Sequence, residues 1–137
     1  MVINVGVMES TFNGMLNNRA MENAIEIKTL EQMNPHVRLE RLRMRLIGAD
    51  KEPITVRGTA FVPVRIGKKK TKLRCVAVEN LNTKLIIGLP GLRDLGLSAD
   101  FKTREIRMGN RIINTVGEVG RQPTENLTEK QQDELEK

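Results

Sequence analysis

One stretch, residues 85–101, constrains the fold of this chain more than any other. It begins with Leu85-Ile86-Ile87, an apolar run typical of a β-strand, and the strand pattern breaks at Gly88. One short helix is predicted over residues 90–95, with Pro90 at its start and Gly96 just after its end. Proline favours the first turn of a helix, and glycine favours the position after its last residue. A second short strand is predicted over residues 98–101. One segment therefore combines a strand, a glycine break, a helical turn and a strand.

The rest of the chain is dominated by predicted short strands. Alternation of apolar and polar residues is clearest over residues 42–46, where Arg43 and Arg45 separate apolar neighbours. The runs over residues 59–66 and 71–78 flank a glycine- and lysine-rich hairpin tip at residues 67–70, and Gly109-Asn110 predicts a two-residue turn between residues 104–108 and 111–116. Residues 1–8 complete this set. Short strands at even spacing predict an all-β sandwich or barrel.

Two segments follow other patterns. Residues 17–27 are predicted to form a weakly amphipathic helix, because Met21, Ala24 and Ile25 share the spacing of one helical face. Residues 29–36 are predicted to form a loop around Pro35. In the strand pairs, Phe61 and Val62 are candidate core residues, and Cys75 is expected to be a small core residue rather than a nucleophile.

Composition limits the class of protein. At 137 residues the chain is long enough for one domain with a modest core, and 39% hydrophobic with 29% charged residues is ordinary for a globular protein. No apolar run approaches the roughly 20 residues of a membrane span, and the N-terminus lacks the features of a signal peptide. The single cysteine, Cys75, cannot form an internal disulfide. We therefore expect a cytoplasmic, nuclear or particle-interior protein that is not secreted and does not enter a membrane.

The charge is unevenly distributed along the chain. Residues 118–137 hold six acids and three bases, whereas the whole chain has a net charge of +6, so residues 1–117 are strongly basic. An arginine row near residue 43 and a lysine cluster at residues 68–74 could contact nucleic acid. A solvated surface is the simpler interpretation, because the chain has no Trp, no Tyr and three Phe, which argues against a base-stacking platform. The lone histidine, His36, has no partner at ligand spacing, so no metal and no cofactor are predicted.

Residues 85–101 resemble the C-terminal part of the retropepsins, the aspartic proteases of retroviruses and LTR retrotransposons, in which a strand ending in Ile-Ile-Gly leads into a short helix and a final strand ending in Asp/Asn-Phe. Residues 56–78 and 46–50 resemble the middle strands and the flap of that family. The resemblance implies a small closed barrel with one short helix, residues 1–117, in which the cleft forms between the two subunits of a homodimer. Residues 118–137 would then be a polar tail or linker.

The resemblance also implies positions for the site. Strand residues 1–8 run into Glu9-Ser10-Thr11, which takes the place of the family's catalytic Asp-Thr/Ser-Gly motif. Glutamate is one methylene longer than aspartate, and threonine cannot replace the glycine that the tight loop needs. The remaining implied site residues are those of the flap, Ile47, Gly48, Ala49 and Asp50, and those of the binding cleft, Ile54, Ile87 and Gly88.

Two hypotheses about function follow from the altered motif. The first is a catalytically inactive, protease-derived module (a pseudoprotease) that forms a homodimer or binds a peptide or polyprotein segment in its cleft. The alternative is an active aspartic endopeptidase that processes its own polyprotein, with a pair of Glu9 carboxyl groups in place of the usual aspartates. A nucleic-acid-associated basic domain is a third and less favoured interpretation.

Overall fold

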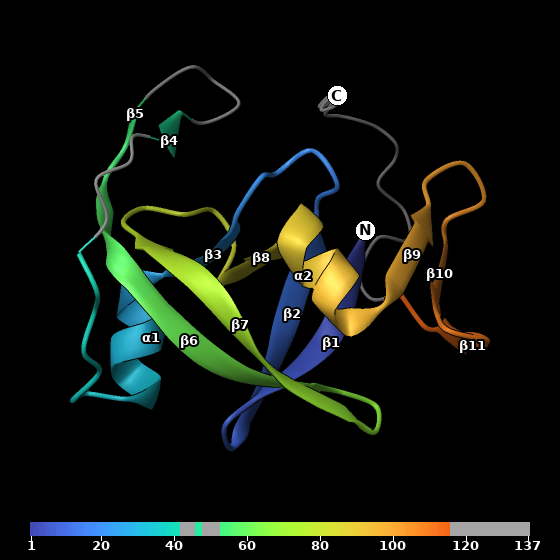
Figure 1. The fold of residues 1–137 in the computed structure, drawn as a ribbon, viewed down its shortest axis with the longest axis horizontal. Helices are drawn as coiled ribbons and strands as arrows, with labels where there is room; N and C mark the ends of the chain where they lie inside the picture. Colours follow the sequence, from blue (N-terminus) through green and yellow to red (C-terminus); the bar gives the residue numbers. More distant parts are fainter. Residues whose placement is uncertain (42–45, 48–52, 116–137) are drawn as a thin grey trace.

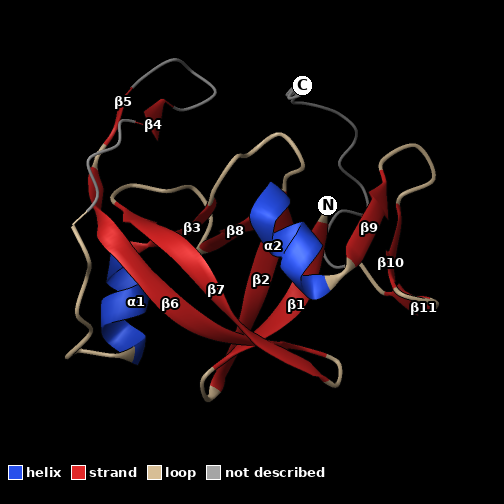
Figure 2. Ribbon diagram, in the orientation of Figure 1, coloured by secondary structure: helices blue, strands red, loops and turns tan. Residues whose placement is uncertain are grey.

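The computed structural model describes residues 1–41, 46–47 and 53–115. Its centre is a closed six-stranded barrel, accompanied by two short helices (Figures 1 and 2). The all-β prediction with a small closed barrel is therefore confirmed. The barrel strands are β1 (Val2–Val7), β2 (Ser10–Leu16), β3 (Asn23–Glu26), β6 (Val56–Ile66), β7 (Lys69–Val78) and β8 (Leu85–Ile87).

The strands follow one another around the barrel in the order β1-β2-β8-β3-β7-β6, and β1 closes the ring against β6. Two neighbouring pairs are parallel, β2 with β8 and β3 with β7, whereas the other pairs are antiparallel. Parallel pairing places the carboxyl ends of β2 and β8 at the same edge of the barrel. The loops that leave these two strands consequently meet there.

The other elements lie around this barrel. Helix α1 (Ile27–Met33) follows β3, and helix α2 (Leu89–Leu95) follows β8, as the proline and glycine punctuation predicted. A separate sheet has the order β11-β10-β9, formed by β9 (Leu97–Asp100), β10 (Glu105–Met108) and β11 (Arg111–Ile113). A two-stranded pair joins β4 (Leu46–Ile47) to β5 (Pro53–Ile54), at the position of the predicted flap. The rest of the predicted flap, the predicted strand at residues 42–45 and the tail fall outside the described residues.

The helix predicted over residues 17–27 is wrong. Residues 17–22 form an irregular loop, residues 23–26 form β3, and α1 occupies most of the segment predicted to be a loop. The physical reason is the place of β3 between β8 and β7, where Asn23, Ala24 and Ile25 are all buried. A strand covered on both faces does not alternate between apolar and polar residues, so its pattern was mistaken for a helical face. The part of the chain that the structure describes therefore has two short helices, and α1 begins where the predicted helix was expected to end.

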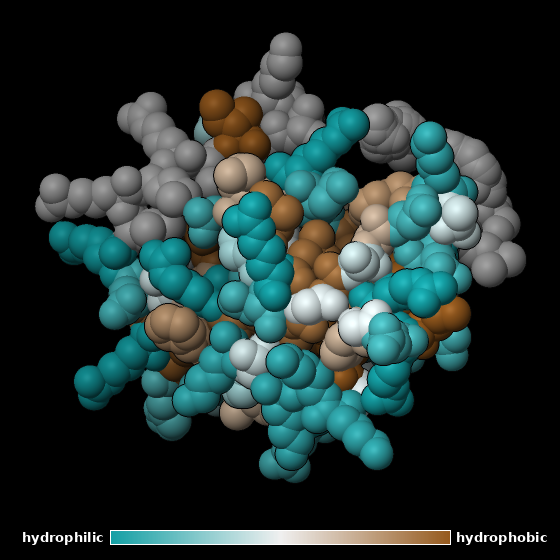
Figure 3. Space-filling model, turned by 45° about the vertical axis from the view of Figure 1, so that its right-hand side comes forward, coloured by the Kyte–Doolittle hydropathy of each residue, from teal (hydrophilic) through white to brown (hydrophobic). Residues whose placement is uncertain are grey.

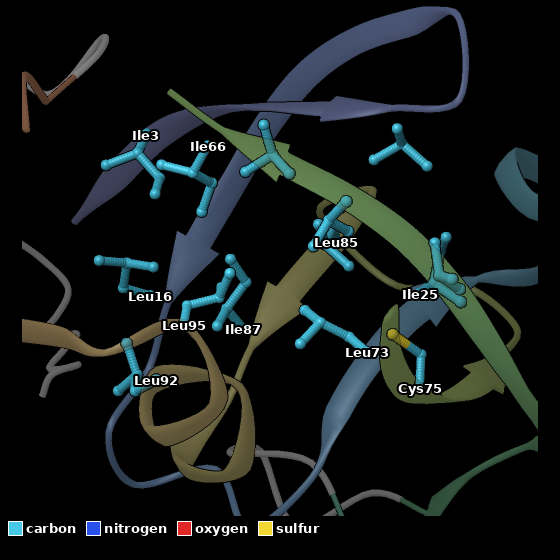
Figure 4. Packing of buried hydrophobic residues seen from close by; sticks show 14 of the residues in the cluster. Ile3, Leu16, Ile25, Ile66, Leu73, Cys75, Leu85, Ile87, Leu92 and Leu95 are labelled. Atoms are coloured by element: carbon cyan, nitrogen blue, oxygen red, sulfur yellow. The ribbon is translucent and has the colours of Figure 1, made fainter. Parts of the chain in front are cut away.

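The barrel interior holds the hydrophobic core (Figure 4). Val62 is 1% exposed, as predicted, but Phe61 is 62% exposed, so its assignment to the core is wrong. Adjacent strand residues point to opposite faces, and the pairing of β6 with β7 directs Val62 inward and Phe61 outward. The largest fully buried side chains are Ile3, Val5, Val7, Ile25, Val62, Val64, Leu73, Leu85, Ile87, Leu95 and Ile106.

Cys75 lies fully inside this core, which confirms its prediction as a structural residue. Burial raises the pKa of its thiol to about 12 from an ordinary value of 9.0. Because the thiolate is the nucleophilic form, a buried thiol that stays protonated at neutral pH does not act as a nucleophile. No helix in the described part of the chain has the length and hydrophobicity that crossing a membrane requires.

Candidate functional site

The loop of residues 17–22, which connects β2 to β3, lies against the segment that joins β8 to α2 (Figure 1). Asn17 N donates a hydrogen bond to Ile87 O at 3.0 Å, which continues the pairing of β2 with β8 by one residue. Leu89 N donates to Ala20 O at 2.8 Å. Two backbone hydrogen bonds, one at each end of Gly88, thus hold the loop to the start of α2.

The loop is also closed internally by Asn17. Ala20 N donates to Asn17 O at 3.1 Å, and Arg19 N donates to the side-chain atom Asn17 Oδ1 at 3.0 Å. An asparagine that accepts a hydrogen bond from the backbone two residues later forms an Asx-turn, which favours tight loops. Asn17 is half-buried, whereas Asn18 and Arg19 are exposed. The turn therefore fixes Asn17 and presents the next two side chains to solvent.

Gly88 allows this close packing. A Cβ at this position would lie 2.3 Å from Glu22 O and 2.8 Å from Ala20 O, inside the contact distance of real atoms. The backbone of Gly88 has φ −85° and ψ −168°, which other residues adopt easily. Glycine is required here because the loop backbone occupies the space of a side chain, and not because of the backbone conformation.

Asn23 ties three elements together beneath the loop. It is 1% exposed, and its Oδ1 accepts hydrogen bonds from Gly88 N and Gly91 N, both at 3.0 Å. Its Nδ2 donates to Arg74 O of β7 at 3.1 Å. The side chain thereby satisfies two free N–H groups in the first turn of α2, which has no side-chain cap of its own. Sequence reasoning missed this residue, and an asparagine within an apolar strand was the signal available.

The chemistry that this loop offers is limited. Residues 17–20 supply two amides and the exposed guanidinium of Arg19. The nearest carboxylate in the sequence, Glu22, lies 3.8 Å from the Arg74 guanidinium and is part of an ion pair. A side-chain amide neither takes up nor gives up a proton near neutral pH, so it cannot serve as a general base. The described residues contain no cluster of metal ligands.

The structure places Glu9-Ser10-Thr11 elsewhere. Met8 and Glu9 form the two-residue turn of the β1–β2 hairpin, and all three motif residues are exposed. This turn is at one end of β2 and the loop of residues 17–22 is at the other, about 20 Å away for a strand of this length. Glu9 is therefore not brought together with Ile87 and Gly88, the residues expected to line the cleft.

The other predicted site residues have different surroundings. Ile87 is fully buried in the core and Gly88 is buried under the loop, whereas Ile86 between strands β2 and β3 is half-buried. Ile54 on β5 is half-buried, and Ile47 on β4 is 70% exposed. The predicted flap residues Gly48, Ala49 and Asp50 lie outside the described residues.

Comparison with known proteins gives a consistent picture of the fold. No protein-family model and no curated protein matches the sequence. The retroviral protease-like domain of Ddi1 from Leishmania major has a TM-score of 0.68 at 17% identity, covering 88% of this chain and 97% of that one. The EIAV protease complexed with the inhibitor HBY-793 has a TM-score of 0.62 at 15% identity, covering 74% and 92%. A retropepsin-like aspartic protease from Rickettsia conorii has a TM-score of 0.52 at 14% identity, covering 72% and 75%. The chain therefore has a retropepsin-like fold.

Proposed function

We propose that this chain is a retropepsin-like module that has lost peptide-bond cleavage and acts as a homodimerising, peptide-binding domain. The observation that carries the proposal is the identity of residues 17–20, Asn-Asn-Arg-Ala. They follow Met15-Leu16 at the end of β2, and they pack on Ile87-Gly88, which belong to the segment that resembles the family. They also have the length and the final alanine of the Asp-Thr/Ser-Gly-Ala catalytic loop. This assignment replaces the motif position at Glu9-Ser10-Thr11 that we expected from the sequence.

Each substitution in this loop removes part of the chemistry. In the active enzymes, two aspartates share a proton, and one acts as base toward water while the other donates to the substrate carbonyl. Two Asn17 amides can neither take the proton from water nor deliver one to the substrate, since an amide is not ionisable at ordinary pH. Arg19 stands at the glycine position, and in a two-fold dimer its positive charge would face its own copy. A peptide could still occupy such a cleft without being cut.

Restoring the motif tests the loss of catalysis. The variant Asn17→Asp/Asn18→Thr/Arg19→Gly should cut members of a mixed peptide library slowly but detectably at acidic pH. Mass spectrometry identifies the cleavage products. The wild type should cut none. The control variant Asn17→Ala/Asn18→Thr/Arg19→Gly has the same loop without the carboxylate and should also be inactive. Wild-type cleavage that is lost in Glu9→Gln would overturn the proposal in favour of an active endopeptidase.

The proposed dimer involves the sheet β11-β10-β9. Strands β9 and β11 each have one edge without a partner strand among the described residues, and unpaired edges are ready templates for pairing with another chain. Phe101 beside β9 is 41% exposed and Ile112 on β11 is 58% exposed. Figure 3, which turns this side of the molecule partly toward the viewer, shows hydrophobic surface among hydrophilic side chains on the visible face. The resemblance likewise implies an interface built by the chain termini.

Sedimentation of the full chain tests this interface. We expect the wild type to sediment as a dimer at micromolar concentration. Phe101→Ser/Ile112→Ser should raise the dissociation constant of the dimer at least tenfold, because the variant lacks the apolar side chains whose burial would stabilise the interface. Met8→Ser is a matched control, since Met8 is 42% exposed at the opposite hairpin and should leave the dimer intact. A wild type that remains monomeric at about 100 μM would contradict the dimer.

A further inference from the structure

We propose that the outer face of the β6–β7 hairpin is a binding site for single-stranded nucleic acid. This face carries three directly opposed residue pairs, which we call the basic strip. Their inward-pointing neighbours Val62, Val64 and Leu73 are buried, so the strip side chains share the outer surface. The pairs are Phe61 with Arg74, Pro63 with Lys72, and Arg65 with Lys70.

The charge of the strip is of one sign. It holds four cations, and Lys68 and Lys69 at the adjoining hairpin tip are exposed. Among the described residues, Arg74 is the one strip cation with an ion pair, at 3.8 Å from Glu22. Successive pairs on one face of a strand are about 7 Å apart, so the cations repeat along the strip as charges repeat along a phosphodiester chain. The strip therefore complements a regularly charged polyanion.

Arg65 is held in position at the end of the strip that adjoins the hairpin tip. Its guanidinium lies across β1, where a Cβ at Gly6 would be 2.6 Å from Arg65 Nη2. Arg65 Nη1 donates a hydrogen bond to Met8 O. The absence of a side chain at Gly6 thus makes room for a guanidinium that is fixed before any ligand arrives. A shallow hollow of about 370 Å³ lies beside it, lined in part by Pro63, Lys70 and Lys72.

Phe61 distinguishes a nucleic acid from other anions. It is 62% exposed at the end of the strip and faces Arg74 across the strand pair. An exposed aromatic ring among cations is the combination on which single strands bind, since bases stack on the ring while the cations contact phosphates. A duplex keeps its bases stacked inside, and an acidic peptide offers the ring no comparable flat partner. Single-stranded nucleic acid is accordingly the occupant that fits both features.

Fluorescence anisotropy with a labelled 20-nucleotide single strand, oligo(dT), tests this site in the full chain. The wild type should bind with a dissociation constant that rises steeply with salt. Lys70→Gln/Lys72→Gln should weaken binding at least tenfold at low salt and flatten the salt dependence. Phe61→Ser should weaken binding several-fold while the salt dependence stays the same. Circular dichroism checks that each variant is folded.

The matched control is Lys28→Gln/Lys102→Gln, which removes two exposed cations, one from α1 and one from the turn between β9 and β10. This variant has the same net charge as Lys70→Gln/Lys72→Gln and should weaken binding less than twofold. An equal loss in both double variants would overturn the site, because it would mean that only net charge matters. Absence of wild-type binding, or tighter binding of a 20-residue poly-glutamate peptide than of the oligonucleotide, would overturn it as well.

Discussion

Replacing Gly88 by alanine is expected to lower the free energy of unfolding by about 3 kcal/mol or more, a large part of the stability of a domain of this size. The added Cβ would meet Glu22 O at 2.3 Å and Ala20 O at 2.8 Å. Both contacts are with backbone atoms, and Ala20 O already accepts a hydrogen bond from Leu89 N, so the Ala20 carbonyl cannot move away without breaking the loop from α2. Urea denaturation of the wild type and the variant measures the difference.

Gly96→Ala is the informative comparison for this prediction. Gly96 ends α2 with φ +67°, where glycine is favoured, yet a Cβ there would meet no atom within 4 Å. Alanine should therefore cost only about 1 kcal/mol, the usual penalty of a left-handed conformation. A loss for Gly88→Ala no larger than that for Gly96→Ala would mean that the loop moves easily to accommodate the added Cβ, and would contradict close contact with the loop as the reason for glycine at position 88.

The sequence predicted those parts of the fold that local signals determine. Proline and glycine mark both ends of α2, and Gly67 and Gly109 take positive φ angles of +58° and +61° in the two predicted hairpins. Such residues act through their own backbone preferences, so they need no knowledge of distant contacts. The resemblance of residues 85–101 was readable for the same reason: a strand, a break and a helix follow one another without an insertion.

The candidate site could not be placed in the same way. The β1–β2 hairpin turns at Met8 and Glu9, where Met8 adopts a φ of +54° without being glycine or asparagine. No turn residue marks this hairpin, so strand β1 looked as though it led directly into a catalytic loop. The loop at Asn17 became apparent only when the parallel pairing of β2 with β8 brought it onto Gly88. That pairing joins residues about seventy apart and has no local signal.

Sequence alone also could not predict which residue of β6 faces outward. Phe61 and Val62 are both suitable core residues, and the alternation alone leaves open which of them faces inward. The pairing of Phe61 with Arg74 settles this by placing the ring outside. Because the strip combines Phe61 with cations from β7, its aromatic member was hidden from a sequence analysis that treated the lysines as a solvated turn.

Asn23→Ala is expected to destabilise the fold by about 4 kcal/mol, since it leaves Gly88 N and Gly91 N unsatisfied where both residues are buried. It also removes the hydrogen bond to Arg74 O that joins β3 to β7. Because α2 has no other side-chain cap, its first turn should open, and the loop packed on Gly88 should lose its support. The midpoint of urea denaturation and hydrogen exchange of the Gly88 and Gly91 amides report the two effects separately.

Asn13→Ala is the control for Asn23→Ala, because Asn13 is the same residue type on another barrel strand, β2, but is exposed. Its loss should stay within about 0.5 kcal/mol, as for other surface positions without a buried partner. A loss below about 1 kcal/mol for Asn23→Ala would contradict the role of its side chain, because two buried amides cannot be left unsatisfied at so small a cost. A large loss of stability with unchanged hydrogen exchange of the Gly88 and Gly91 amides would mean that Asn23 acts through its hydrogen bond to β7. The loop would then be supported by backbone hydrogen bonds alone.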